Sequence, residues 1–511
     1  MTQNSENNKR IAKNTLFLYI RMVVIMLVQL YTSRVILQTL GVEDYGIYNI
    51  VGAVVISLSF ITGPLSTATQ RFLSFELGKK NTERIKDIFS MSLIVYGILS
   101  IILLIVAETV GLWFLNHKMD IPADRLYAAN WVFQCSIITF IINILNTPFN
   151  SAIIAYEKMS FYAYISIFEA IAKLAIVYFL LLYTEDKLIL YGILVVIVTL
   201  SVTTLYKLYC GKYLKDIKIH FIKDKQLLKQ LLSFSGWSLF GSIASMSADQ
   251  GLNLLLNLFF GVTVNAAMGI ANQVSAAVNQ FVINFQTAFR PQIIKSYAED
   301  DMEYLHQLIC RSSKFSFLLL FMVVCPIFFN IEFILHLWLG NNVPQYTVEF
   351  CKLIFIYALI ESLSAPLWMT VQATGKIKQY QICISSLMFL NIIISYLLLK
   401  SISTSPQTVL FIKCFMAFIY LAVRIYFMKI KISLPIFSFL RQVIIPVIIT
   451  AIIDISLLAF FHTSSHQEQF VKSTESITLF FCTHIMSTYI FALNSNEREK
   501  ISTYVKHKIL Y

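Results

Sequence analysis

The chain has 511 residues, of which 57% are hydrophobic and only 13% are charged, and its mean hydropathy is +0.71. A water-soluble domain of this size could not bury so much apolar side chain, so the composition excludes that class of protein. A formal net charge of +12 would suggest a nucleic-acid partner in a soluble protein. Here the basic residues fall in short loops, where an anionic membrane surface explains them, and no nucleic acid is expected.

Apolar segments follow one another through the whole chain, separated by short polar loops. A membrane-spanning helix needs about 20 such residues, so the pattern predicts an all-α integral membrane protein with about 14 transmembrane helices. The predicted spans are residues 13–38, 45–70, 87–110, 126–150, 161–183, 188–209, 233–259, 265–289, 314–337, 347–372, 379–399, 407–428, 440–461 and 474–493.

Lysine and arginine are distributed unevenly between the two sides of the predicted bundle. With the N-terminus placed in the cytoplasm, most of these residues lie in cytoplasmic segments such as residues 207–229. The basic residues of the opposite side are Lys118, Arg125, Lys187, Lys400 and Lys472. This asymmetry follows the positive-inside rule, so both termini are predicted to be cytoplasmic and the number of spans to be even.

The eight cysteines are scattered, and none has the spacing of a metal-ligand or redox motif. Most lie inside predicted spans, where a thiol packs as a small apolar group. We therefore expect no disulfide, no metal and no bound cofactor. The sequence also contains no Gly-rich phosphate-binding motif, so we expect a proton gradient, a sodium gradient or substrate flux to drive any transport.

The chain resembles itself at a period of about 220 residues. The segment GVEDYGIYNI after the first span matches GVTVNAAMGI after the seventh, Pro148 matches Pro366, and Lys158 matches Lys376. Six spans per unit is an even number, so both halves have one orientation, as in transporters that rock two lobes around a central cavity. The predicted organisation is an N-terminal six-helix lobe (1–210), a basic cytoplasmic linker (211–232), a C-terminal six-helix lobe (233–430) and two extra helices with a cytoplasmic tail (431–511).

Several segments resemble the MOP superfamily of exporters, which has a MATE-like fold. They are NTLFLYIRMVVIMLVQLYTSRVILQTLGVEDYGIYNIV at the start, STATQRFLSFELGKKN at the end of span two, and TPFNSAIIAYEKM in span four. The segment LGVEDYGIY is similar to the corresponding part of Wzx-type polysaccharide flippases, the exporters of O-antigen, lipopolysaccharide and capsule precursors. The resemblance implies flipping of undecaprenyl-diphosphate-linked oligosaccharide across a bacterial inner membrane. It also implies membrane lipids and other polysaccharide-assembly membrane proteins as candidate partners.

Basic residues at membrane depth are candidates for the substrate site. A charge at a helix centre costs about 2.5–3.5 kcal/mol, so such residues usually face a cavity or a partner. Arg21, Lys173 and Lys413 lie well inside their predicted spans, and we interpret them as lining a cavity. Arg424 lies nearer a span end, where it could reach the interface, but it shares a helix face with Lys413. Glu169 precedes Lys173 by one turn, an order that also allows the two to neutralise each other.

Small polar residues form stripes on spans seven and eight. The first stripe contains Asp249, and the second contains Asn272 and Asn279. Stripes of this length on adjacent helices indicate a water-lined surface, although small polar residues also join helices. Asp249 is the acidic residue of its stripe, so it is a candidate for proton coupling; permanent pairing with a cavity cation is the alternative. Glu361 lies on a polar face of span ten and completes the predicted cavity.

These observations predict a flippase that works by alternating access of two lobes around a partly cationic cavity. Cations suit the diphosphate, and amide, hydroxyl and aromatic side chains suit sugars. A drug/cation antiporter of the MATE type and a peptidoglycan lipid-precursor flippase are the closest alternatives. A membrane enzyme would need a sizeable outer loop with titratable residues, and an ion channel would need a filter loop. The sequence indicates neither, so an enzyme is not expected.

Overall fold

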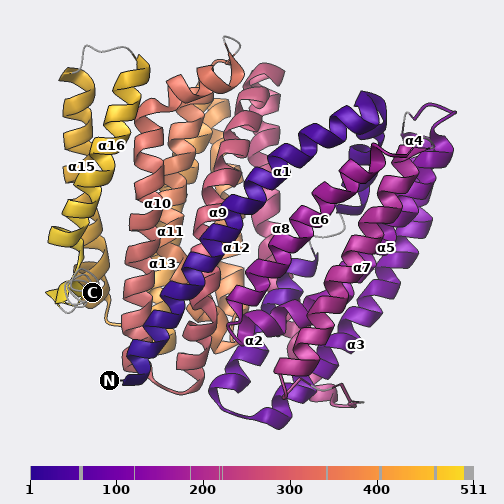
Figure 1. The fold of residues 1–511 in the computed structure, drawn as a ribbon. Coiled ribbons are helices and arrows are strands. Elements are labelled where there is room, and N and C mark those ends of the chain that lie inside the picture. The colour runs from indigo at the N-terminus through magenta and orange to yellow at the C-terminus, as the bar shows by residue number, and fades with distance from the viewer. Residues whose placement is uncertain are drawn as a thin grey trace, which may run out of the picture. The chain divides into compact units, whose positions relative to one another are not determined.

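The computed structural model describes residues 2–56, 61–119, 121–183, 186–217, 219–220, 222–340, 343–401, 405–464, 469–495 and 497–499. Every regular element within these residues is a helix, as the sequence predicts (Figure 1). In a helix the backbone N–H and C=O groups form hydrogen bonds with each other. Lipid offers them no partners, so long apolar segments in a membrane are helical.

The helices form two compact units. Unit 1 consists of Met1–Ser242 together with Thr287–Asp301, and unit 2 of Ile243–Gln286 together with Met302–Tyr511. The lobe boundaries drawn from the sequence remain a prediction.

Unit 1 contains the helices of the first repeat. They are α1 (Thr2–Ile56), α2 (Thr62–Gly78), α3 (Thr82–Val106), the π-helical turn η2 (Ala107–Gly111), α4 (Leu112–Lys118), α5 (Leu126–Ala155), α6 (Met159–Leu180) and α7 (Lys187–Tyr213). Helices α8 (Lys225–Phe260) and α9 (Val262–Ala298) contribute to both units. Within unit 1, α5 packs against α2, α3 and α7, and α1 packs against α6.

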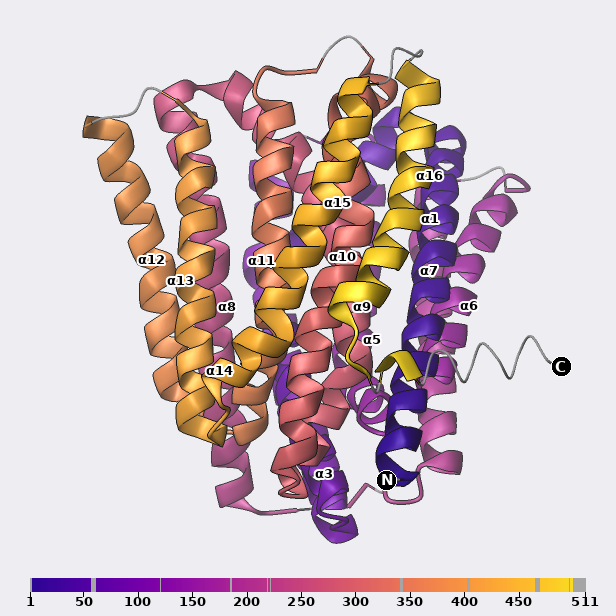
Figure 2. The same cartoon turned by 90° about the vertical axis from the view of Figure 1, so that its left-hand side faces the viewer.

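Unit 2 contains the second repeat and the C-terminal helices. They are α10 (Met302–Leu339), α11 (Thr347–Thr374), α12 (Lys378–Ser401), α13 (Gln407–Ile432), α14 (Ile436–Phe439), the π-helical turn η3 (Leu440–Ile444), α15 (Ile445–Ser464), α16 (Gln469–Ser487) and the π-helical turn η4 (Thr488–Ala492). Helix α11 packs against α10 and α13, and α15 and α16 lie beside each other and beside α10 (Figure 2).

Ten of the described helical segments are long and apolar enough to cross a membrane, from Arg10–Gly41 to Ile436–Phe460. The described parts of the predicted spans fall on helices. Of the span predicted over 45–70, the structure describes the part up to Ile56, where α1 is described to end, and the part from Ile61, which precedes α2 at Thr62; residues 57–60 lie outside the described residues. Pro64 lies in the first turn of α2, where a residue without an N–H is tolerated, and this placement favours a helix start there.

The backbone repeats its unusual turns. Three pairs of residues with positive φ match each other in the two repeats: Gly41 (82°) with Gly261 (80°), Lys80 (55°) with Asp300 (59°), and Glu157 (58°) with Gly375 (74°). Gly41 marks the kink inside α1, and Gly261 separates α8 from α9. Helix-to-helix turns of the same kind at matching positions give structural support to the internal duplication.

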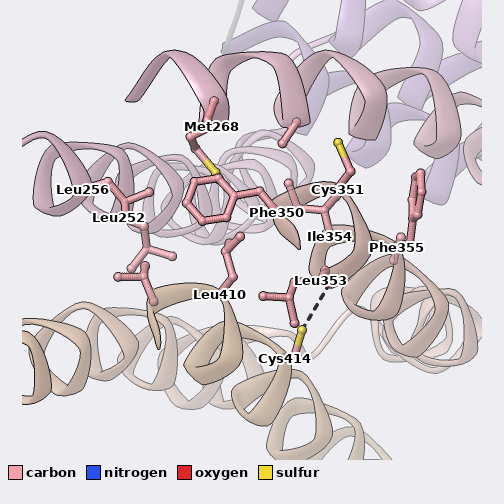
Figure 3. Packing of buried hydrophobic residues seen from close by; sticks show 14 of the residues in the cluster. Leu252, Leu256, Met268, Phe350, Cys351, Leu353, Ile354, Phe355, Leu410 and Cys414 are labelled. Carbon is pink, nitrogen blue, oxygen red and sulfur yellow. Dashed lines mark hydrogen bonds between the residues drawn. The ribbon is translucent and has the colours of Figure 1, made fainter. Parts of the chain in front are cut away.

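The core of unit 2 lies between α8, α9, α10, α11 and α13, with a contribution from α12. Figure 3 shows Leu256 of α8 and Met268 of α9 close to Phe350 of α11, with Leu410 of α13 on the other side. These side chains are almost completely buried. The packing fixes α11 and α13, which carry the charged residues described below.

Glu157 holds a buried carboxylate in the turn between α5 and α6 of unit 1. Its fully buried side chain accepts hydrogen bonds from Lys295 Nζ (2.5 Å) and Gln292 Nε2 (2.7 Å) of α9, and pairs with Arg10 Nε of α1 (2.9 Å). Burial lowers the pKa of Lys295, and the Glu157 carboxylate acts in the opposite direction. The left-handed backbone of Glu157, where the other repeat has Gly375, is held in place by these contacts.

A second ion cluster lies at the other end of unit 1. Arg125 donates two hydrogen bonds to Asp44 (2.8 and 2.6 Å) and pairs with Asp186 (2.9 Å) at the start of α7. Asp44 belongs to the segment GVEDYG that follows the kink in α1. The cluster therefore fixes this segment against α5 and α7.

Buried polar contacts attach the last helices to α10. Lys314 Nζ donates to the carbonyl oxygen of Ala492 (2.7 Å) and pairs with Glu497 (2.8 Å). His484 of α16 contacts the Asp454 carboxylate of α15 through Nδ1 (2.6 Å) and the main-chain oxygen of Leu318 through Nε2 (3.2 Å). Because both imidazole nitrogens face polar partners on neighbouring helices, α10, α15 and α16 are joined at this residue.

Candidate functional site

Arg424 and Glu361 form a buried ion pair in unit 2. Arg424 Nη1 donates to Glu361 Oε1 (2.9 Å) and Oε2 (2.8 Å), and its Nε donates to the hydroxyl of Tyr380 (3.1 Å). Helices α13, α11 and α12 supply the three residues, and Arg424 is only 5% exposed. Charge-assisted bonds of this kind are strong and satisfy both ions. Arg424 is therefore a buried partner of Glu361 and does not reach the interface alone.

Lys413 and Asp249 form a second ion pair in the same unit. Lys413 Nζ donates to Asp249 Oδ1 at 2.8 Å and lies 4.6 Å from the ring centroid of Tyr357. The Lys413 side chain is 14% exposed and that of Asp249 is 54% exposed. Asp249 thus has a cationic partner in this structure, and its role in proton coupling stays a prediction.

Asn272 and Asn279 lie exposed on α9. Asn279 Nδ2 donates to Ser275 Oγ of the same helix at 3.2 Å. In the part of the chain that the structure describes, no hydrogen bond links either asparagine to the ion pairs. The four predicted charged residues of unit 2 thus form two ion pairs, whereas these two amides make no hydrogen bond to them among the described residues.

In unit 1, Lys173 and Arg21 have different surroundings. Lys173 Nζ donates to Glu169 Oε1 of the preceding turn at 2.6 Å, as the sequence spacing allows. The guanidinium carbon of Arg21 lies 4.4 Å from the ring centroid of Tyr162 on α6. Its Nε is buried and has no hydrogen-bond partner among the described residues. Arg21 is thus held over an aromatic ring and is not neutralised by a carboxylate in the described part of the chain.

Unit 1 contains a partly open cavity of about 370 Å³ lined by residues of α1, α2, α5, α6 and α7. Its lining residues are Tyr48, Gly52, Val55, Thr62, Cys135, Ser136, Thr139, Phe140, Asn143, Ile144, Thr147, Lys173, Tyr191, Gly192 and Val195. The volume lies at the lower end of the range for small-molecule pockets.

Helix α5 contributes a polar stripe to this cavity that the sequence analysis missed. Ser136, Thr139, Asn143 and Thr147 recur at steps of three or four, so one helix face carries all of them. The Thr139 hydroxyl is buried and finds no hydrogen-bond partner in the described part of the chain. The signal was present in the spacing, as it was for spans seven and eight.

The residues that line the cavity suit a neutral or anionic ligand. Lys173 is the one charged residue among the described residues of its lining, none of which is a carboxylate. Hydroxyl and amide groups supply donors and acceptors, and Tyr48 and Tyr191, whose centroids are 5.0 Å apart, supply aromatic surface. Such groups bind hydroxyl-rich molecules by hydrogen bonding and ring contact, and the lysine favours negative charge.

Comparison with known proteins identifies the fold. Residues 17–179 match the family model MatE. The chain is similar to an outward-facing multidrug resistance MATE family transporter of the MOP superfamily, at a TM-score of 0.72 and 14% identity, over 84% of this chain and 96% of that chain. It is also similar to a MOP superfamily transporter from Pyrococcus furiosus Vc1 (DSM3638), with a TM-score of 0.71, 14% identity and the same coverage of both chains. No curated protein matches the sequence. The chain therefore has the MATE fold and is a multi-pass membrane protein.

Proposed function

We propose that this protein is a flippase for undecaprenyl-diphosphate-linked oligosaccharide in a bacterial inner membrane, working by alternating access of its two lobes. The observation that carries the proposal is the cavity of unit 1, whose lining contains Lys173 and many hydroxyl and amide groups. A lipid-linked oligosaccharide has a diphosphate and sugar hydroxyls, and its tail can stay in the lipid while the head group crosses.

The polarity of the cavity argues against a drug/cation antiporter. A site for cationic drugs needs a carboxylate, and the described lining residues of this cavity contain none. In the Pyrococcus furiosus transporter, reverse polarity of the binding pocket suggests a different function, so pocket polarity is a useful criterion within this fold. A peptidoglycan lipid-precursor flippase shares the diphosphate and sugar chemistry and is the alternative that the cavity also favours.

The partners of each basic residue help to assign which of these residues contact the diphosphate. Lys413 and Arg424 already bind Asp249 and Glu361, whereas Arg21 stacks on Tyr162. We therefore assign the contacts first to Arg21, which has no carboxylate partner among the described residues, and to Lys173, which pairs with Glu169 but lines the cavity. At 1.5 Å per residue, Tyr162 and Lys173 are about 16 Å apart along α6. One diphosphate cannot contact Arg21 and Lys173 at the same time over this distance. The two cations therefore bind the diphosphate at successive positions along the translocation path.

The test is surface-polysaccharide production in cells that lack the native protein. Losing one charge-assisted contact costs about 1.5–3 kcal/mol, so Arg21→Gln or Lys173→Gln should slow flipping tenfold or more. Arg21→Lys should restore part of the activity, and Lys400→Gln, which changes an exposed cation at the end of α12, serves as the control. Wild-type polysaccharide from both Gln variants at normal protein levels would refute the proposal.

The same strain set separates the alternatives. Complementation of a strain that lacks its peptidoglycan-precursor flippase, without complementation of the polysaccharide strain, would favour the precursor flippase. Resistance of efflux-deficient cells to cationic dyes, without either complementation, would favour the antiporter.

A further inference from the structure

We propose that Asn143 determines the sign of charge that the unit 1 cavity accepts, and that the cavity binds a phosphate-ester anion beside Lys173. The inference rests on the proposed function, because the anion is then the diphosphate of the cargo. It comes from comparing the two repeats, each taken within its own unit.

The repeat places Asn143 at the position of Glu361. Each lies five residues before the proline inside its helix, Pro148 in α5 and Pro366 in α11. The positive-φ turns that follow these helices also match between the repeats. The alignment at this position therefore rests on backbone features as well as on residue identity.

In unit 2, the corresponding part of α11 carries side chains that contact Arg424 and Lys413 of α13. The Glu361 carboxylate receives two hydrogen bonds from Arg424, and Tyr357, one turn earlier on α11, lies under Lys413. The residue of α5 that matches Tyr357 is Thr139, since each lies nine residues before its proline. A large aromatic side chain and a paired carboxylate thus correspond to a small hydroxyl and a neutral amide.

These two replacements explain both the space and the charge of the unit 1 cavity. Thr139 and Asn143 both line it, and the unpartnered Thr139 hydroxyl and the Asn143 amide can donate hydrogen bonds. Lys173 is balanced by Glu169 on its own helix, with 40% and 36% of the two side chains exposed. An anion entering the cavity would meet Lys173 and neutral donors, because Glu169, the partner of Lys173, is not part of the lining. A glutamate at position 143, as in unit 2, would oppose the anion with like charge and offer Lys173 another carboxylate.

The experiment measures binding of inorganic pyrophosphate to the purified full-length protein, by calorimetry and by thermal shift. Wild type and Asn143→Gln should bind it. Asn143→Glu should weaken the affinity at least tenfold, because like-charge contacts cost several kcal/mol. Asn143→Asp places the same charge on a shorter side chain, and should act in the same direction if the glutamate variant does not fold.

Asn130→Glu is the matched control, because it adds the same charge to α5 outside the cavity lining. It should bind pyrophosphate as wild type does. Equal loss in this control, or wild-type affinity in both folded acidic variants, would overturn the assignment to Asn143. A wild-type protein that does not bind pyrophosphate would overturn the anion site, while polysaccharide complementation would still test the proposed function separately.

Discussion

The buried carboxylate of Glu157 offers a direct test of how unit 1 is held together. Glu157→Ala removes the acceptor of Lys295 and Gln292 and the ionic partner of Arg10. Leaving one ion of a buried pair uncompensated costs about 3–5 kcal/mol, and the Glu157 side chain is fully buried. We therefore expect the free energy of unfolding to fall by about this amount, measured by reversible unfolding in mixed micelles.

The left-handed backbone at Glu157 makes the comparison sharper. Glu157→Gly loses the same contacts but relieves a φ of 58°, so it should be about 1 kcal/mol more stable than Glu157→Ala. Gly375→Ala supplies the comparison at the corresponding turn, because an alanine at its φ of 74° carries a backbone cost of about 1 kcal/mol. A Glu157→Ala variant within 1 kcal/mol of wild type, or a Gly variant less stable than the Ala variant, would refute this reasoning.

The pH dependence of Glu157→Gln follows from Lys295. Burial lowers the pKa of Lys295, and the variant loses the carboxylate that raises it. The unfolded chain then binds more protons than the folded one between the lowered pKa and the ordinary value of 10.5. Stability of the variant should rise with pH across this window, and its deficit against wild type should shrink. A deficit that grows with pH would contradict the assignment of the effect to Lys295.

Two further predictions concern single side chains. A Cβ at Gly78 would lie 2.8 Å from a main-chain oxygen of α9, so Gly78→Ala should destabilise the protein by about 1–3 kcal/mol. Gly97→Ala is the control, because a Cβ at Gly97 would have nothing within 4 Å and should not destabilise the protein. Equal thermal stability of the two variants would contradict the packing argument. Because Asp249 is paired with Lys413 and half exposed, Asp249→Asn should cost less than about 1 kcal/mol and leave the pH profile of flipping in vesicles unchanged; a shifted profile would restore Asp249 as a coupling residue.

Features that depend on the local sequence pattern could be predicted. The length of the apolar segments predicted the helices, and the i, i+4 spacing of Glu169 and Lys173 predicted their contact. The kink at Gly41 lies in the short polar connection predicted between the spans 13–38 and 45–70, so the sequence indicated its place.

Long-range pairing was beyond the sequence. Lys413 and Asp249 are 164 positions apart, so no spacing rule indicates that one neutralises the other. The polar stripe on α5 that contains Asn143 and Thr139 has a helical period that the sequence shows. It was not predicted as a site because it carries no charge, and the site prediction relied on charged residues at membrane depth. The cavity itself needs five helices in place before it exists.

The polar attachment of α15 and α16 to α10 has a consequence for biogenesis. His484 meets the main-chain oxygen of Leu318 across 166 positions of chain, and Lys314 meets Glu497 across 183. At about 5–20 residues per second, a nascent chain needs roughly 10 to 40 s to extend from Lys314 to Glu497. During that time the ammonium of Lys314 lies inside or beside the membrane without its final partner. Insertion must therefore shelter this face of α10 until the last helices are synthesised, and C-terminal truncation should expose the protein to quality control before it affects any substrate contact.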